Sequence, residues 1–79
     1  MAKGGNPDMG KNHGELNNQL EERRRWSGLT QAALADKVGV SRKSINSIEN
    51  GIYIPTTVLA LKIAEALNCT IHDLFQLPN

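Results

Sequence analysis

Two charged residues occupy positions where the helical periodicity calls for buried apolar side chains. Leu16, Leu20 and Arg24 follow one another at i, i+4 and i+8, which places the arginine on the inward face of a first helix. Glu49 lies at i+4 from Ile45 and therefore points toward the interior from another helix. Because an unpaired buried charge is very costly, the two opposite charges are most simply explained by pairing with each other. The sequence predicts a structural ion pair between Arg24 and Glu49.

A second pair of polar residues lies where a helix begins. Thr30 has the side chain of an N-cap, and Gln31 follows it at the first helical position. The backbone amides at such a helix start are exposed, and they suit a phosphate group. The pattern indicates a phosphate contact at this point of the chain.

The residues that enzymes and metal sites commonly use are few and scattered. His13 and His72 lie far apart in the sequence, and Cys69 is the single cysteine. We interpret Cys69 as a small core residue rather than a reactive thiol, because no base is evident for it. An internal disulfide and a zinc site are both excluded by this set of residues. We expect no catalytic residue, no metal and no cofactor, and hence a protein that is not an enzyme.

The segment from Gln31 to Asn50 must position the polar residues, and its apolar residues have the spacing of two short helices packed at a steep angle. Gly39 falls where a helix ends in a left-handed residue, and Ser41 follows as the N-cap of the next helix. Ala35 is small where a larger side chain would push the helices apart. These features match a helix-turn-helix better than an ordinary αα-hairpin. The two apolar faces consist of Leu34, Ala35 and Val38, and of Ile45 and Ile48.

Two more helices are expected outside this segment, one on each side. The first runs from about Leu16 to Trp26. After a loop at residues 52–55, Thr56 caps a helix from about Thr57 to Leu67. The inner stripe of that helix is formed by Leu59, Ile63 and Leu67.

A short last helix is expected near the C-terminus. Asn68 suits the left-handed position that ends the preceding helix. Thr70 and Asp73 have the spacing of a capping box, with Asp in place of Glu, and open a helix that runs through Phe75. The aromatic residues are interpreted as packing residues because they are scattered along the chain; they are Trp26, Tyr53 and Phe75.

Composition and length set the outer limits. The chain has 79 residues, of which 39% are hydrophobic and 4% aromatic, which favours one compact all-α domain. Residues 1–14 are rich in glycine and lack apolar periodicity, so we expect a disordered arm there and the domain at residues 15–79. The alternative for the arm is a role in wrapping DNA through Lys3 and Lys11.

The net charge of +1 neither supports nor refutes nucleic-acid binding. Without a long apolar run or an apolar N-terminal stretch, the expected location is cytoplasmic, with no membrane association.

Four motifs resemble the lambda-repressor/Cro-like (XRE) helix-turn-helix family in their order and spacing. They are GLTQ at 28–31, LADKVGVS at 34–41, IENG at 48–51 and ALNCTIHDLF at 66–75. The resemblance covers residues 18–77 and implies a compact five-helix bundle of the lambda-repressor-like DNA-binding type. In that family the arginine of the first helix pairs with the glutamate of IENG, in agreement with the pair inferred for Arg24 and Glu49. The chain departs from the family at Arg23, where many members have an apolar residue, and at Asn68, where glycine is usual.

Family positions carried over residue by residue imply which side chains contact DNA. Arg42 and Lys43 lie in the first turn of the helix that enters the major groove, and both side chains favour guanine O6 and N7. The alternative for these two residues is contact with phosphate alone. The resemblance implies base reading by Ser41, Arg42, Lys43 and Ser47, and phosphate contacts by Thr30, Gln31, Ser44, Asn46 and Asn50.

The favoured function is a sequence-specific DNA-binding transcriptional regulator that inserts its third helix into the major groove of a near-palindromic operator. One module makes few base contacts, so the protein is expected to bind double-stranded DNA as a homodimer. Candidates for the dimer surface are Ile52, Ile54, Val58, Phe75 and Leu77, with packing within the monomer as the alternative.

The alternative function is a protein-interaction module, such as an antitoxin or a coactivator-like partner. The low net charge favours this alternative, whereas Arg42 and Lys43 argue against it as the sole role. The segment at 53–75 also resembles a subgroup in which the helix-turn-helix occurs alone or ahead of a periplasmic-binding-protein-like effector domain. An effector domain or partner protein outside this chain is therefore a further expected partner.

Overall fold

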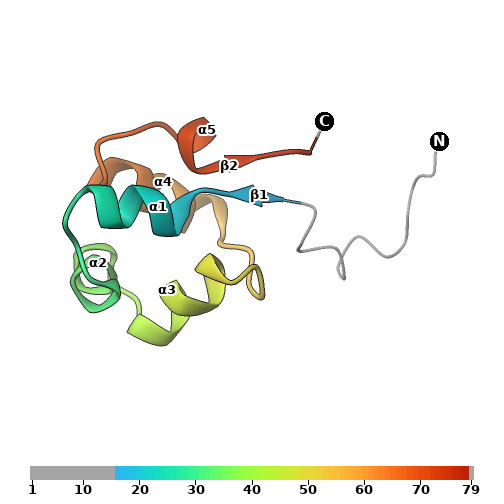
Figure 1. Cartoon of the computed structure of the whole chain (residues 1–79). Coiled ribbons are helices and arrows are strands. Elements are labelled where there is room, and N and C mark those ends of the chain that lie inside the picture. Colours follow the sequence, from blue (N-terminus) through green and yellow to red (C-terminus); the bar gives the residue numbers. More distant parts are fainter. Residues whose placement is uncertain (1–15, 79) are drawn as a thin grey trace.

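A computed structural model describes residues 16–78, and it contains five helices and one small sheet (Figure 1). The helices are α1 (Leu20–Trp26), α2 (Gln31–Val38), α3 (Arg42–Glu49), α4 (Thr57–Ala66) and α5 (Ile71–Leu74). Strands β1 (Asn17–Asn18) and β2 (Phe75–Gln76) pair in antiparallel orientation. The predicted five-helix fold is confirmed. The arm predicted at residues 1–14 lies outside the described residues, and none of the helices within 16–78 is long and apolar enough to cross a membrane.

The first helix begins later than the prediction of about Leu16, because the preceding residues have other partners. Asn18 pairs with Phe75 in the sheet, and its side-chain oxygen accepts a hydrogen bond from the N–H of Leu20 at 2.9 Å. Its amide nitrogen donates to the carbonyl oxygen of Ile48 at 2.6 Å. The periodicity of Leu16, Leu20 and Arg24 therefore extended the expected helix across a segment that the structure uses as a strand.

Side-chain caps fix where the other helices start. The hydroxyl oxygens of Thr30, Ser41, Thr56 and Thr70 accept hydrogen bonds, at 3.0, 3.1, 3.1 and 3.2 Å respectively, from the backbone N–H three residues further on. These four caps confirm the predictions. Such caps are each worth about 1 kcal/mol.

The last helix is closed at its start by the predicted capping box. The N–H of Thr70 donates to Asp73 Oδ2 at 2.9 Å. This hydrogen bond is the main reason why the pKa of the Asp73 carboxyl is lowered, and a hydrogen bond with the Thr70 side chain is the second reason. The helix ends at Leu74 and not at Phe75 as predicted, because Phe75 enters β2. Asn68 has a φ of 56°, the left-handed conformation that was expected for it.

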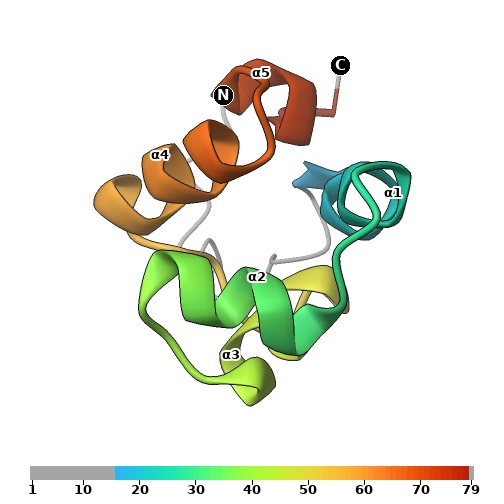
Figure 2. The same cartoon turned by 90° about the vertical axis from the view of Figure 1, so that its left-hand side faces the viewer.

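Helices α2 and α3 lie together on one side of the molecule, with α4 and α5 on the other (Figure 2). The core between them contains the predicted inner faces of α2, α3 and α4, and Cys69 packs against its edge. Burial raises the pKa of the Cys69 thiol, which keeps it protonated as expected of a packing residue. The fully buried large residues are Leu20, Leu34, Ile45, Ile48, Ile63 and Leu74.

The interpretation of all three aromatic residues as packing residues was wrong for two of them. Trp26 is 84% exposed and Tyr53 is 43% exposed, whereas Phe75 packs against the core. Trp26 is the last residue of α1, and Tyr53 lies in the loop before α4.

Gly39 offers a test of the turn between α2 and α3. Its φ is +79°, and a Cβ added there would meet no atom within 4 Å, so backbone conformation alone opposes a side chain. Gly39→Ala should lower the free energy of unfolding by roughly 1 kcal/mol. Gly39→Asn should lose less, because asparagine tolerates the left-handed region. Urea denaturation measures both, and equal stability of the alanine variant and the natural protein would contradict the expected strain.

Candidate nucleic-acid interface

The predicted ion pair is present in the interior, behind α3. Arg24 Nε lies 2.6 Å from Glu49 Oε2, and Arg24 Nη2 donates to Glu49 Oε1 at 3.2 Å. The side chains are only 9% and 3% exposed. Arg24 Nη1 also donates to the carbonyl oxygen of Leu29 at 2.8 Å, so one guanidinium connects α1, the corner before α2 and the end of α3. The bonded carboxylate raises the pKa of Arg24, which stays charged at every relevant pH.

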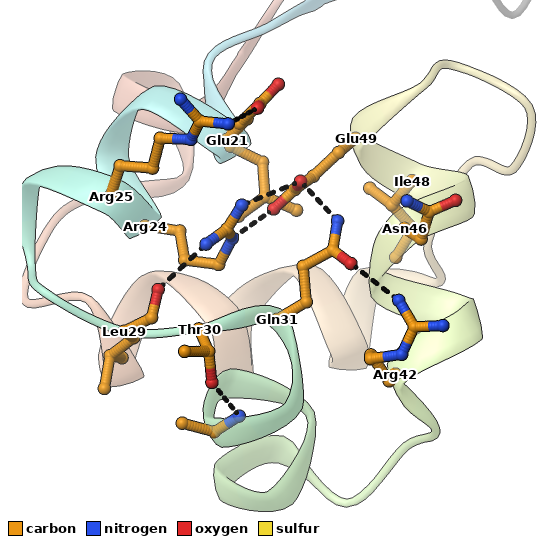
Figure 3. Close-up of polar contacts among 12 residues, drawn as sticks. Glu21, Arg24, Arg25, Leu29, Thr30, Gln31, Arg42, Asn46, Ile48 and Glu49 are labelled. Atoms are coloured by element: carbon orange, nitrogen blue, oxygen red, sulfur yellow. Dashed lines mark hydrogen bonds and ion pairs between the residues drawn. The ribbon is translucent and has the colours of Figure 1, made fainter.

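Gln31 extends this ion pair to the front of α3. Its Nε2 donates to Glu49 Oε1 at 2.9 Å, and its Oε1 accepts a hydrogen bond from Arg42 Nη1 at 3.0 Å. Figure 3 shows the Gln31 amide between the two partners. Arg24, Glu49, Gln31 and Arg42 thus form one continuous side-chain network from the interior to the first turn of α3.

The start of α3 carries two exposed cations at an electrostatically unfavourable place. Arg42 and Lys43 are its first two residues, and the first turn contains no acidic residue. A helix N-terminus already carries a partial positive charge, so each cation there opposes helix stability by about 0.3–1 kcal/mol when exposed. Helix stability therefore does not explain these residues. An anionic ligand at this place would gain from both the cations and the helix dipole.

Several of the predicted base-reading residues surround one shallow hollow beside α3. Its volume is about 280 Å³, and its lining consists of Ser41, Lys43, Ser44, Ser47 and Tyr53. Ser41 also serves as the N-cap of α3, and its hydroxyl lies 3.1 Å from that of Ser44. Among the predicted base-reading residues at the hollow, Lys43 and Ser47 have no capping role.

Tyr53 is a candidate that sequence reasoning missed. The loop after α3 folds back on the helix, since the N–H of Ile52 and that of Tyr53 both donate to the carbonyl oxygen of Ser47, at 2.9 and 3.3 Å. This return places Tyr53 at the hollow with Lys43 and Ser47. The only signal in the sequence was a tyrosine shortly after the IENG motif.

Among the predicted phosphate-contacting residues, Thr30 lies at the start of α2, and Asn46 and Asn50 lie within α3 and at its C-terminal end. Asn50 Nδ2 donates to the carbonyl oxygen and to Oδ1 of Asn46, at 2.9 and 3.2 Å. Thr30 uses its oxygen as the N-cap of α2 and is exposed, as is Asn50. Their DNA contacts, like those of Ser44, stay predictions.

A larger hollow, of about 430 Å³, lies elsewhere on the molecule. It is lined by Gln19, by Asp73 and by three residues of α1, which are Glu22, Arg23 and Trp26. Arg23 Nη2 lies 3.6 Å from Asp73 Oδ1 there. None of the predicted DNA-contacting residues borders it. The hollow at α3 is therefore the better candidate for the functional site, because it is lined by the exposed Lys43 and by Ser41 and Ser47, which were predicted to read bases.

Helices α2 and α3, joined by the turn at 39–41, define a helix-turn-helix whose second helix presents cations at its exposed start. The family model for the helix-turn-helix group HTH_3 matches residues 20–74. The chain therefore belongs to the HTH_3 (XRE/Cro-type) family, and it is a DNA-binding transcriptional regulator rather than an enzyme.

Individual relatives agree with this assignment. The chain is 39% identical over 62 residues to the HTH-type transcriptional regulator YgzD of Bacillus subtilis, covering 78% of this chain and 94% of YgzD. The restriction-modification controller protein C.AhdI of Aeromonas hydrophila superposes with a TM-score of 0.69 at 33% identity, over 87% of this chain and 94% of that one. The P22 c2 repressor, solved in complex with a synthetic operator, superposes with a TM-score of 0.66 at 31% identity, over 68% and 82% of the two chains.

The buried ion pair can be tested against an exposed pair on the same helix. Arg24→Met should lower the free energy of unfolding by about 3–5 kcal/mol, because it leaves Glu49 buried without its cation. The matched control is Arg25→Met, which removes an exposed pair in which Arg25 Nη2 lies 2.8 Å from Glu21 Oε2. That variant should lose under about 1 kcal/mol. Chemical denaturation compares the two variants. Equal losses in the free energy of unfolding would show that burial does not make the Arg24–Glu49 pair more important for stability than the exposed pair.

Proposed function

We propose that this protein is a sequence-specific regulator that inserts α3 into the major groove of a near-palindromic operator. The observation that carries the proposal is the pair of exposed cations in the first turn of α3, the part of a recognition helix that reaches base edges. The operator complex of the similar P22 c2 repressor supports it. Because its ligand would be DNA, we expect the protein to act in the cytoplasm.

Within this proposal the contacts fall into two groups. Arg42 and Lys43 read guanine O6 and N7, and Ser41 and Ser47 add hydroxyl contacts along the same side of α3. The backbone phosphates are contacted by residues on both sides of α3, whose polar groups fix the position of the protein on the duplex. These phosphate-contacting residues are Thr30, Gln31, Ser44, Asn46 and Asn50, to which we add the hydroxyl of Tyr53.

Dimerisation through the loop before α4 and the outer face of α4 completes the proposal. Ile52, Ile54 and Val58 are 66%, 44% and 63% exposed, and the neighbouring Leu61 is 54% exposed. Phe75 leaves the predicted set, because it packs against the core of its own chain. Leu77 stays in it at 82% exposure. A second copy on this surface would cover the apolar side chains and bring a second α3 to the other half-site.

Selection of bound duplexes from a random pool tests the DNA-binding proposal. We expect enrichment of one half-site repeated about one helical turn apart. Arg42→Ala should then relax the preference at one base pair by about 1–3 kcal/mol, whereas loss of a phosphate contact would weaken all duplexes alike. Fluorescence anisotropy at several salt concentrations separates these effects. Failure to enrich any sequence would contradict the proposal and would favour a protein-interaction module.

The oligomeric state tests the dimer surface. Sedimentation equilibrium should show a dimer, and Val58→Asp should raise its dissociation constant at least about tenfold, because a charge would be buried at the interface. Trp26→Asp is the matched control, since Trp26 is apolar and 84% exposed on a different helix. A dimer that persists in Val58→Asp but dissociates in Trp26→Asp would place the interface on α1 instead.

A further inference from the structure

Asn18 uses both ends of its side-chain amide on backbone groups of two different helices. Its Oδ1 accepts a hydrogen bond from the N–H of Leu20 at 2.9 Å, and its Nδ2 donates to the carbonyl oxygen of Ile48 at 2.6 Å. A backbone N–H only donates and a backbone carbonyl only accepts, so these partners fix which end of the amide faces which helix. The Asn18 side chain therefore joins the start of α1 to the end of α3.

The carbonyl of Ile48 belongs to the last turn of α3, where helix carbonyls lack partners from their own helix. It also accepts a hydrogen bond from the N–H of Gly51 at 3.0 Å, so both of its acceptor positions are used. Arg24 holds the same end of α3, but it does so through the Glu49 side chain. Asn18 differs from Arg24 because it bonds the backbone of the helix, whose position does not depend on a side-chain rotamer.

Asn18 is in turn held by the C-terminal part of the chain. It pairs with Phe75 in the antiparallel pair of β1 and β2, which lie side by side in Figure 1. The N–H of the next residue, Gln19, donates to the carbonyl oxygen of Leu74 at 2.8 Å. Contacts with the segment around β2 thus fix the backbone at Asn18, and the Asn18 side chain connects that segment to α3.

The end of α3 leads into residues that we propose as phosphate contacts. Asn50 is the C-cap of α3, and Tyr53 lies in the loop that folds back on the helix. The N–H of Tyr53 donates to the carbonyl oxygen of Ser47, the residue before Ile48. A shift of the last turn of α3 would therefore move both polar side chains relative to a bound duplex. The base-reading cations lie at the other end of the helix and would be affected less.

We propose that Asn18 is a positioning residue for DNA binding, which ties the β1–β2 pair to the last turn of α3 and so holds the phosphate-contacting residues there in place. The inference rests on the proposed function, since it concerns how the end of α3 meets the duplex. Its particular content is that a residue of β1, without a DNA contact of its own, controls the affinity for DNA but not the preference for a base.

Asn18→Asp separates the two bonds of the Asn18 side chain. A carboxylate keeps an acceptor for the N–H of Leu20 and is favourable at a helix start, but it has no N–H for the carbonyl of Ile48. The variant should bind the duplex selected from the random pool about 3- to 10-fold more weakly. The duplex altered at the base pair whose preference Arg42→Ala relaxes should lose the same factor. Fluorescence anisotropy measures both affinities, and a loss of discrimination between the duplexes would contradict a role confined to the end of α3.

Asn17→Asp is the matched control, because it places the same charge on the neighbouring, exposed residue of β1. A screened charge there should weaken binding by less than about twofold. If Asn18→Asp binds as tightly as Asn17→Asp while Asn18→Ala binds weakly, Asn18 acts only at the start of α1 and the inference is overturned. Thermal unfolding checks that the variants are folded in the binding assay. Should Asn18→Asp not fold, Asn18→Ala and Asn17→Ala repeat the comparison without a charge.

A measurement without DNA separates this inference from the proposed function. The backbone N–H groups of Ile52 and Tyr53 are both bonded to α3, and they should exchange with solvent at least about threefold faster in Asn18→Asp than in Asn17→Asp. The N–H of Gly39, which is bonded within the turn before α3, is the internal reference and should exchange at the same rate in both variants. Hydrogen exchange followed by NMR measures all three groups.

Each outcome of the exchange measurement has a separate meaning. Equal exchange of the Ile52 and Tyr53 amides in the two variants would overturn the inference whatever DNA selection finds. Faster exchange that includes Gly39 would also overturn it, because it reports a loss of global stability. Faster local exchange with unchanged DNA affinity would show that the tie does not serve binding. Faster local exchange with no enriched duplex would overturn the proposed function and leave the tie between Asn18 and α3 standing.

Discussion

The ion pair between Arg24 and Glu49 joins parts of the chain that are far apart in the sequence. One guanidinium bonds the end of α3 and the corner between α1 and α2, and Gln31 connects the same carboxylate to the start of α3. A buried pair is a poor source of net stability, because desolvation offsets most of the attraction. Its value here is geometric: it fixes how α3 lies against α1 and α2. The pair therefore sets the orientation of α3, and of its exposed face, relative to α1 and α2.

The charge distribution along α3 follows from the same pair. The helix has one acidic residue, Glu49, at its end and two cations, Arg42 and Lys43, at its start. Arg24 neutralises Glu49 in the interior, so the carboxylate subtracts little from the positive potential at the exposed start. This explains how a chain with a net charge of only +1 can present a local site for an anion. The net charge of the whole chain does not reveal this site, because it counts the buried Glu49 together with the exposed Arg42 and Lys43.

Stability and function make opposite demands on the start of α3. The cap at Ser41 and the left-handed Gly39 favour the helix and its turn, whereas Arg42 and Lys43 oppose the helix dipole. Local rules are commonly broken where a protein binds its ligand, and the rest of the fold compensates. Here the compensation comes from the core, where Ile45 and Ile48 are fully buried beneath the exposed polar face.

Much of the structure was determined by the sequence through short-range rules. The caps at Thr30, Ser41, Thr56 and Thr70 and the left-handed residues Gly39 and Asn68 depend on neighbours within a few positions, and all were predictable. Glu49 and Arg24 were also predictable as a pair, because two opposite charges on inward faces have few other solutions.

Tertiary structure alone decided the features that depend on distant partners. Residues 17–18 lie between Leu16 and Leu20 of the helical periodicity, yet they form a strand because they pair with Phe75 and Gln76. Tyr53 joins the hollow at α3 only because its loop folds back onto Ser47. The bonds of Gln31 to Glu49 and Arg42 likewise require α2 and α3 to be packed together. Periodicity and capping report the local conformation of the chain, whereas these contacts depend on how the finished helices pack.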